Sequence, residues 1–499
     1  MVMARRAVAV LRGILVGTGG ILSLVLALLV ALYFRPLELA QVAREQDVGA
    51  LLRARFGRAS VAAHEVQTAD GHLLGLFHIR SRSRHRCGDG GGGGRASHAL
   101  LLHGLADNAA TWLVGHHAAA SAAACTGGGE RGAAAATSCP QSLVSQLLGA
   151  GVDVWLGQTR GRPPFRHRTL SPEQPAYWDF SHDELIAQDA PALIRAAARG
   201  AAVAAAAGSG GGGGGGGSGG KARLALVGHS QGALALLAAV AIDQELARAP
   251  APGVSVRAAV VLSCPHLELG GEPQGPAAAA TVAPPERHPT PVLLRWLGAA
   301  VGPGPSPLRV WWALHTFIRH ACALLPAVCS HCICAAAGCA SAANFAPRAV
   351  VVPQIFAFYP APDSWRSALH FGQVRASGRW RRWWRCDGNG TAPPDAYGWD
   401  GLAAAGMRIS AFYGERDRMN PTTLAGAART LARIASAGTS TGTGDSTVGD
   451  TGSFPAFGHA DLVWGSGASS ELFPRVVAAV LRGSGDERNE SSCAAAEPQ

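Results

Sequence analysis

The feature that most constrains the fold is a serine at a sharp turn inside an apolar run. Residues 224–239 read LALVGHSQGALALLAA. The β-prone residues before Gly228 predict a strand, and the Ala- and Leu-rich run after Gly232 predicts a helix. Glycine at both positions lets the strand and the helix approach closely, while the turn exposes the Ser230 hydroxyl. We interpret this Gly-x-Ser-x-Gly pattern as a nucleophile elbow, although a plain Gly/Ser turn would share its letters.

Strand and helix patterns alternate on both sides of this turn. An Asp70-Gly71 turn at the centre of residues 64–80 predicts a β-hairpin. Short apolar strands that alternate with helices indicate an α/β fold, with a mostly parallel sheet covered on both faces. Further strands are expected within 97–103, 152–156, 256–264 and 407–414, and helices from 141 and at 182–198, 422–434 and 469–483.

The interval 266–400 breaks this alternation. It is rich in Trp, Phe, Pro and Cys, and we interpret it as a cap, or lid, inserted between two core strands. The core is then expected in two parts, 60–265 and 401–483, followed by a flexible tail at 484–499.

Four low-complexity stretches interrupt the chain, and we interpret them as surface insertions rather than as linkers between domains. They are dominated by Gly, Ala, Ser and Thr and lie at 88–95, 118–138, 208–220 and 436–453.

The N-terminal segment, 1–40, favours a membrane location. Residues 13–34 carry no charged side chain, and arginines precede them. A run of this length can cross a bilayer, and its basic end is expected on the cytosolic side. We therefore expect an uncleaved anchor with a lumenal catalytic domain in the secretory or endomembrane system. A cleaved signal peptide on a lysosomal, vacuolar or secreted enzyme is the alternative.

The net charge of +10 does not indicate a nucleic-acid partner, because the arginines are scattered and no recognition motif is present. The one dense basic patch, RWRRWWRC at 379–386, interleaves arginine with tryptophan. This combination suits an anionic lipid surface, such as a membrane or a lipid droplet. An ordinary amphipathic surface segment is the alternative.

Five of the eleven cysteines gather in the predicted cap, where a lumenal location would permit disulfides. His331 stands within the closest spacing, but no second pair follows at zinc-site spacing, so no metal site is expected. The sequence leaves open whether at least one disulfide or a set of buried thiols forms among Cys322, Cys329, Cys332, Cys334 and Cys339.

A serine nucleophile needs a histidine base, and that base needs an acid to orient it. Asp417 follows the strand predicted at 407–414, and His459 lies on a short loop before the last helix. The chain order Ser230, Asp417, His459 fits a fold in which each residue follows a strand. Asp461 is the rival acid, but its closeness to His459 in sequence favours a structural role.

The oxyanion of an acyl-transfer intermediate also needs hydrogen-bond donors. One candidate is the backbone N–H of Gln231, directly after the serine. The loop after the strand at 97–103 supplies the second, which we assign to the Leu105 N–H. His103 is expected to hold that loop by hydrogen bonds rather than to act as a base.

With these residues and motifs, the chain resembles the acid lipase family, which includes lysosomal and gastric lipases, fungal steryl ester hydrolases and plant relatives. The resemblance spans about 60–483, and its cap departs from the family between 266 and 350. GVDVWLGQTRGR is similar to a family strand that usually ends Asn-Ser-Arg-Gly-Asn, so Gln158, Thr159 and Arg162 differ. The motifs that carry it are HEVQTADGHLLGLFHI, LLHGLADNAATWL, GVDVWLGQTRGR, LSPEQPAYWDFSHDELIAQDAPALI, GHSQG and GHADLVWG.

The resemblance implies an α/β-hydrolase fold and a Ser230–Asp417–His459 triad, with Leu105 and Gln231 as oxyanion donors. It also implies hydrolysis of neutral lipid esters, such as triacylglycerols or sterol esters, with no cofactor. Two alternatives use the same fold: an acyltransferase or small-ester carboxylesterase with the same triad, and a non-catalytic lipid-binding scaffold.

Overall fold

The computed structural model describes residues 44–81, 97–115, 141–208, 222–265, 307–377, 382–383, 398–399, 401–420, 424–439 and 448–484. The expected N-terminal anchor, the tail, the start of the cap and nearly all of the basic patch lie outside these ranges. Over the described ranges, which begin at residue 44, no helix combines the length and apolar character needed to cross a bilayer.

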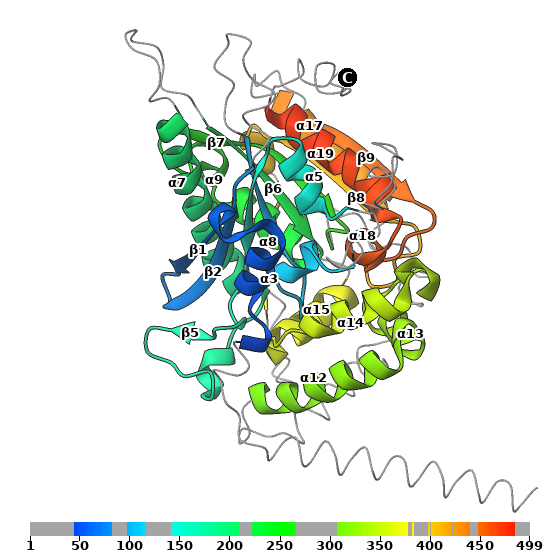
Figure 1. Cartoon of the computed structure of the whole chain (residues 1–499). Helices are drawn as coiled ribbons and strands as arrows, with labels where there is room; N and C mark the ends of the chain where they lie inside the picture. The colour runs from blue at the N-terminus through cyan, green and yellow to red at the C-terminus, as the bar shows by residue number, and fades with distance from the viewer. Residues whose placement is uncertain are drawn as a thin grey trace, which may run out of the picture.

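The described strands form one sheet in the order β1-β2-β4-β3-β6-β7-β8-β9, with β5 paired to β2 (Figure 1). The hairpin β1–β2 is antiparallel, as predicted, and β2 joins β4 in the same sense. From β4 to β9 every pairing is parallel. The strands are β1 Val61–Gln67, β2 His72–Ile79, β3 Ser97–Leu102, β4 Asp153–Gly157, β5 Arg166–His167, β6 Ala222–His229, β7 Val254–Leu262, β8 Arg408–Gly414 and β9 Val448–Phe454.

Strand β9 corrects one interpretation of the sequence. The stretch 436–453 is not an insertion throughout, because its first residues end a helix at Thr439 and its last residues pair with β8, with one register shift in the ladder. An edge strand has one neighbour and needs little apolar alternation. Polar contacts support it instead: Arg475 forms an ion pair with Asp450 at 2.8 Å, and its guanidinium lies 5.7 Å from the centre of the Phe454 ring.

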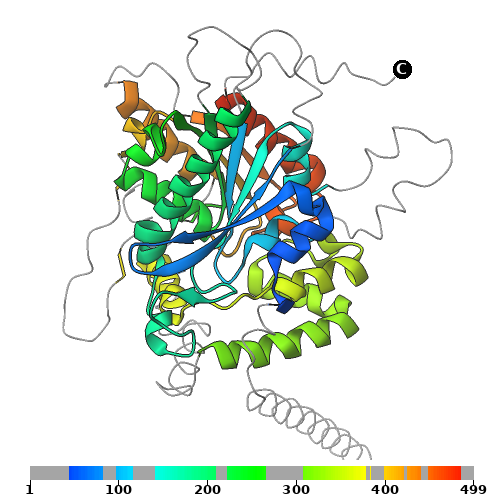
Figure 2. The same cartoon turned by 60° about the vertical axis from the view of Figure 1, so that its left-hand side comes forward.

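Helices cover both faces of the sheet, as the alternating pattern predicts, and Figure 2 shows the sheet between them. One apolar core lies under α7, α8 and α17, and a second lies under α3, α5 and α19. Helix α8 is buried on nearly all sides because it crosses the centre of the sheet. The bounds are α3 Val48–Phe56, α5 Leu143–Gly149, α7 Ala190–Gly208, α8 Gln231–Ile242, α17 Leu424–Thr439 and α19 Phe473–Ser484.

Between β7 and β8 the chain forms a helical group that gathers at one end of the sheet in Figure 1. Its helices are α12 Pro307–Leu324, α13 Pro326–Ala337, α14 Arg348–Phe358 and α15 Trp365–Ser377. Among the described residues, Cys322–Cys329 and Cys334–Cys339 form disulfides in this group, which decides the choice between disulfides and buried thiols that the sequence left open for these four cysteines. Cys332 carries an exposed free thiol.

Candidate active site

Ser230 lies at the turn between β6 and α8, where the sequence predicts an elbow. Its backbone adopts φ 53° and ψ −123°, a conformation that an L-residue takes only at a cost. A Cβ on Gly228 would stand 2.3 Å from the Ala233 Cα, and one on Gly232 would stand 2.4 Å from the carbonyl oxygen of His103. Only glycine therefore fits on either side of the serine.

Asp417 and His459, which are 42 positions apart in sequence, meet through a hydrogen bond. The His459 Nδ1 and the Asp417 Oδ2 are 2.8 Å apart. Because a carboxylate accepts this bond, Nδ1 carries the proton and Nε2 is left as the acceptor. The pairing of these two residues, expected from chain order alone, is present in the structure.

The Asp417 carboxylate is held in its charged form by its neighbours. Burial by itself would raise its pKa, but the electrostatic attraction of His459 and then hydrogen bonds from His459, Ser263 and the Asn420 amide outweigh burial and lower the pKa below its usual value. The Ser263 hydroxyl donates to Oδ2, and the amides of Met419 and Asn420 donate to Oδ1 at 2.8 and 2.9 Å.

Ser263 and Asn420 were not anticipated from the sequence. Ser263 directly follows β7 with φ 49°, and the Asn420 side-chain amide donates to its carbonyl oxygen at 3.0 Å. The signal that could have found Ser263 is its position, because the carboxyl ends of neighbouring parallel strands meet at one sheet edge.

His229 connects the elbow to the His459 loop and was also missed. Its Nε2 lies 3.2 Å from the His459 carbonyl oxygen, and the two rings have their centres 4.7 Å apart. Burial, and then the neighbouring His459, lower the His229 pKa to about 3, so the ring is neutral and Nε2–H donates this bond. The hydrogen bond between Ser230 Oγ and His459 Nε2 stays a prediction.

Asp461 has the structural role that the sequence analysis expects. Its Oδ2 accepts hydrogen bonds from the backbone amides of Gly458 at 2.7 Å and Ala340 at 2.6 Å. The carbonyl oxygen of Gly338, at the end of α13, accepts a hydrogen bond from the His459 amide. The cap helices are thus tied directly to the loop that carries His459.

The loop after β3, residues 103–108, lies against the elbow, and we call it the oxyanion loop because the Leu105 donor is expected there. A Cβ built on Gly104 would be 3.3 Å from the Ser230 Cβ. His103 Nε2 lies 3.3 Å from the Thr159 N–H that it accepts, and Nδ1–H donates to the Gly104 carbonyl oxygen at 2.9 Å. Burial keeps the pKa of His103 well below its usual value, so His103 holds the loop as a neutral ring, as expected.

The two expected oxyanion donors come from this loop and from the first residue of α8. Gln231 begins α8, so its N–H has no acceptor within the helix. Among the described residues, neither the Leu105 amide nor the Gln231 amide has a hydrogen-bond partner. The role of both amides as oxyanion donors stays a prediction.

Among the described residues, one group of side chains could hold a metal ion, and it lies at the opposite ends of the parallel strands from Ser230. His78, His98 and Asp153 are buried at the end of β2 and at the starts of β3 and β4. Several of their polar atoms already have partners: Asp153 accepts from the Ser81 amide at 2.9 Å, and the Trp155 indole donates to His98 Nδ1 at 3.4 Å. We interpret this group as a hydrogen-bonded element of the core.

Comparison with known proteins matches residues 57–116 to the family described as a partial α/β-hydrolase lipase region. Lipase member K from Homo sapiens is 30% identical over 201 residues, which are 39% of this chain and 39% of that protein. Triacylglycerol lipase 2 from Arabidopsis thaliana is 32% identical over 26% of each chain. Gastric triacylglycerol lipase from Bos taurus is 28% identical over 34% of this chain and 32% of its own length. The chain thus spans less than two fifths of the length of each of these relatives.

Proposed function

We propose that this chain is a serine ester hydrolase of the acid lipase family, with an α/β-hydrolase fold, that acts on fatty-acyl esters of neutral lipids; its similarity to lipases supports the proposal. Ser230 is the nucleophile, His459 the general base and Asp417 the acid that orients it. The observation that carries the proposal is the hydrogen bond of 2.8 Å from His459 Nδ1 to Asp417 Oδ2. It fixes the tautomer that a serine-activating base requires.

The reaction begins when His459 Nε2 takes the proton from Ser230 Oγ as the oxygen attacks the ester carbonyl carbon. The backbone amides of Leu105 and Gln231 donate hydrogen bonds to the oxyanion that forms. His459 then gives the proton to the departing alcohol oxygen, and an acyl-enzyme remains. Water, deprotonated by His459, attacks the acyl carbon, and the fatty acid leaves as Ser230 regains its proton.

The neutral-lipid substrate class is supported by the relatives, two of which are named as triacylglycerol lipases. We assign the core to 60–265 and 401–483 and the cap to 266–400. The hydrogen bond between the His459 amide and Gly338 at the end of α13 supports a cap that contacts the reaction site. Residues 13–34 would keep the enzyme at a membrane or lipid-droplet surface, where its substrate is concentrated.

The test is the Ser230→Ala variant, assayed for fatty-acid release from an emulsified triacylglycerol and from a sterol ester. The expected result is loss of release from both lipids with unchanged circular dichroism. Ser470→Ala is the matched control, because Ser470 is exposed and donates only to the Gly467 carbonyl. Retained release by folded Ser230→Ala would overturn the proposal. Ester formation with an added alcohol, without release of acid, would favour an acyltransferase.

A further inference from the structure

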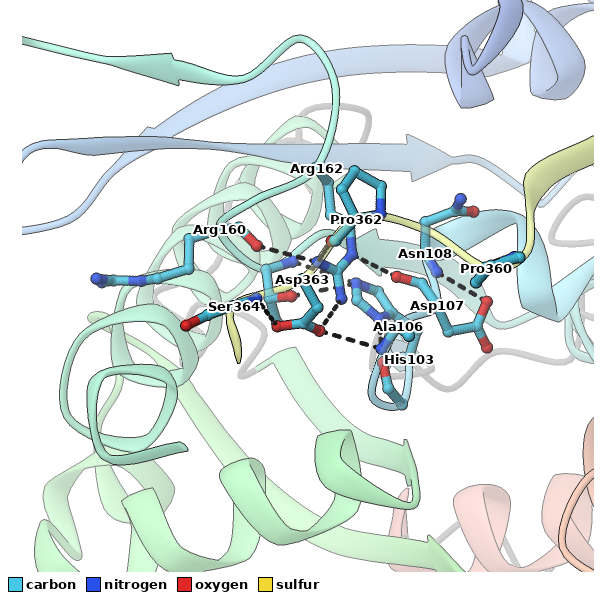
Figure 3. A network of polar contacts seen from close by, with 12 residues as sticks. His103, Ala106, Asp107, Asn108, Arg160, Arg162, Pro360, Pro362, Asp363 and Ser364 are labelled. Atoms are coloured by element: carbon cyan, nitrogen blue, oxygen red, sulfur yellow. Dashed lines mark hydrogen bonds and ion pairs between the residues drawn. The ribbon is translucent and has the colours of Figure 1, made fainter. Parts of the chain in front are cut away.

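Arg162 is a buried cation that contacts two other segments of the chain. It follows β4, and its side chain is 2% exposed. Its Nε donates to the carbonyl oxygen of Asp107 in the oxyanion loop, and its Nη1 donates to that of Pro362, just before α15. Its Nη2 lies 2.8 Å from Asp363 Oδ2. Figure 3 shows the Arg162 guanidinium between the oxyanion loop and the segment that carries Pro362 and Asp363.

Asp363 extends this contact to the residue that follows Leu105. The same Oδ2 accepts a hydrogen bond from the Ala106 amide at 3.0 Å. The Ala106 carbonyl oxygen in turn accepts from the Ala361 amide at 2.7 Å. Ala106 has φ 52°, a backbone conformation that an alanine holds only when its surroundings impose it. Both polar groups of Ala106 are therefore held by the segment 359–364.

These contacts determine where the Leu105 N–H points. The Gly104 carbonyl and the Leu105 amide belong to one planar peptide unit, and His103 holds that carbonyl. The next peptide unit contains the Ala106 amide, which Asp363 holds. With the peptide units on both sides of the Leu105 Cα fixed, the Leu105 N–H has little freedom to turn. The proposed oxyanion donor is thus set from upstream by His103 and from downstream by Asp363.

We propose that Arg162 and Asp363 form a positioning pair that aims the Leu105 amide and couples its aim to the cap segment 359–364. The inference rests on the proposed function, because it gives that amide a role in catalysis.

The alternative is that the ion pair only stabilises the fold. Replacing just one partner would leave a buried charge unpaired, which destabilises a protein whatever its function. The decisive variant is therefore Arg162→Asn with Asp363→Asn, which removes both charges together. Arg166→Asn is the control, because Arg166 begins β5, close to Arg162 in sequence, and pairs with Glu65 at the surface, where their side chains are 57% and 42% exposed.

The assay is steady-state hydrolysis of a soluble short-chain ester by the full-length protein, with active enzyme counted by fluorophosphonate titration. Loss of an oxyanion donor lowers kcat by about 100- to 1000-fold, so a misdirected donor should lower it by about 10- to 100-fold. We expect that fall in the double variant with KM within twofold, because the donor acts in the transition state. Arg162→Lys, which keeps the charge but loses the forked geometry, should fall between the double variant and the wild type.

The outcomes separate the two claims. A double variant with wild-type kcat, or with a changed KM and unchanged kcat, would overturn the positioning role and leave the proposed function intact. If the double variant does not fold, the single variants Asp363→Asn and Arg162→Lys test the positioning role instead. A lower kcat with unchanged KM supports the role, and an unchanged kcat contradicts it. A wild-type enzyme without hydrolysis or titratable serine would overturn the proposed function itself.

Discussion

Replacing Asp417 by asparagine tests the catalytic geometry with a change of very few atoms. The Asn Oδ1 can still accept from the Met419 and Asn420 amides, as the carboxylate does at 2.8 and 2.9 Å. The side-chain NH₂ then faces His459 Nδ1 and donates to it. The imidazole must place its proton on Nε2, which is the nitrogen needed to accept the proton of Ser230.

The expected cost is large because the base is lost while the fold is kept. The same substitution in the Ser-His-Asp triad lowers kcat by about 10⁴, equivalent to about 5.4 kcal/mol at about 1.36 kcal/mol for each factor of ten. The assay is kcat for a soluble short-chain ester at neutral pH, with folding checked by circular dichroism. A folded Asp417→Asn variant within tenfold of the wild-type kcat would refute the assignment of Asp417.

Asp461→Asn is the matched control, because Asp461 accepts two backbone amides and contacts no triad side chain in the described hydrogen bonds. It should lower the melting temperature and change kcat by less than about tenfold, since hydrogen bonds to a charged group contribute about 1.5–3 kcal/mol to stability. A larger loss of kcat in Asp461→Asn than in Asp417→Asn would identify Asp461 as the acid.

Two further predictions concern stability. Gly232→Ala should lower the melting temperature and the free energy of unfolding, the latter by about 1–3 kcal/mol or more, because the new Cβ would lie 2.4 Å from the carbonyl oxygens of Leu102 and His103. Gly149→Ala is the control, because no atom lies within 4 Å of the Cβ it would add. Equal melting temperatures for the two variants would contradict this packing. Burial raises the pKa of Asp107 from 3.8 to about 7, so the folded state binds the proton more tightly and stability should fall by up to about 4 kcal/mol as pH rises from about 4 to about 7. Asp107→Asn should remove that part of the pH-dependent fall in the free energy of unfolding, which urea titrations at several pH values measure. An unchanged pH dependence in this variant would count against the raised pKa of Asp107.

Much of the fold could be predicted because its local signals agree with one another. The elbow at Ser230, the Asp70-Gly71 hairpin turn and the apolar run of β7 each have a residue pattern that one backbone geometry satisfies. Strand β9 was missed because an edge strand is held by one ladder and by contacts such as Arg475 with Asp450. A periodic pattern of apolar residues does not predict such contacts.

The candidate site was predictable where chain order determines proximity. Strand ends along one sheet edge bring Asp417 to His459 whatever the loops contain. Arg162 and Asp363 could not be paired in advance, because they are 201 positions apart and meet only through the path of the cap. Ser263 was missed because a serine after a strand has no distinctive neighbours until its strand is placed beside β8.

The central claim is that the Ser230 hydroxyl is activated by His459. The most direct measurement is the reaction of the purified protein with a fluorophosphonate, with the modified residue located by peptide mass spectrometry. The account predicts a single adduct on Ser230 that forms far more slowly in His459→Ala. An adduct on another serine, or labelling of Ser230 at the same rate without the imidazole, would contradict it.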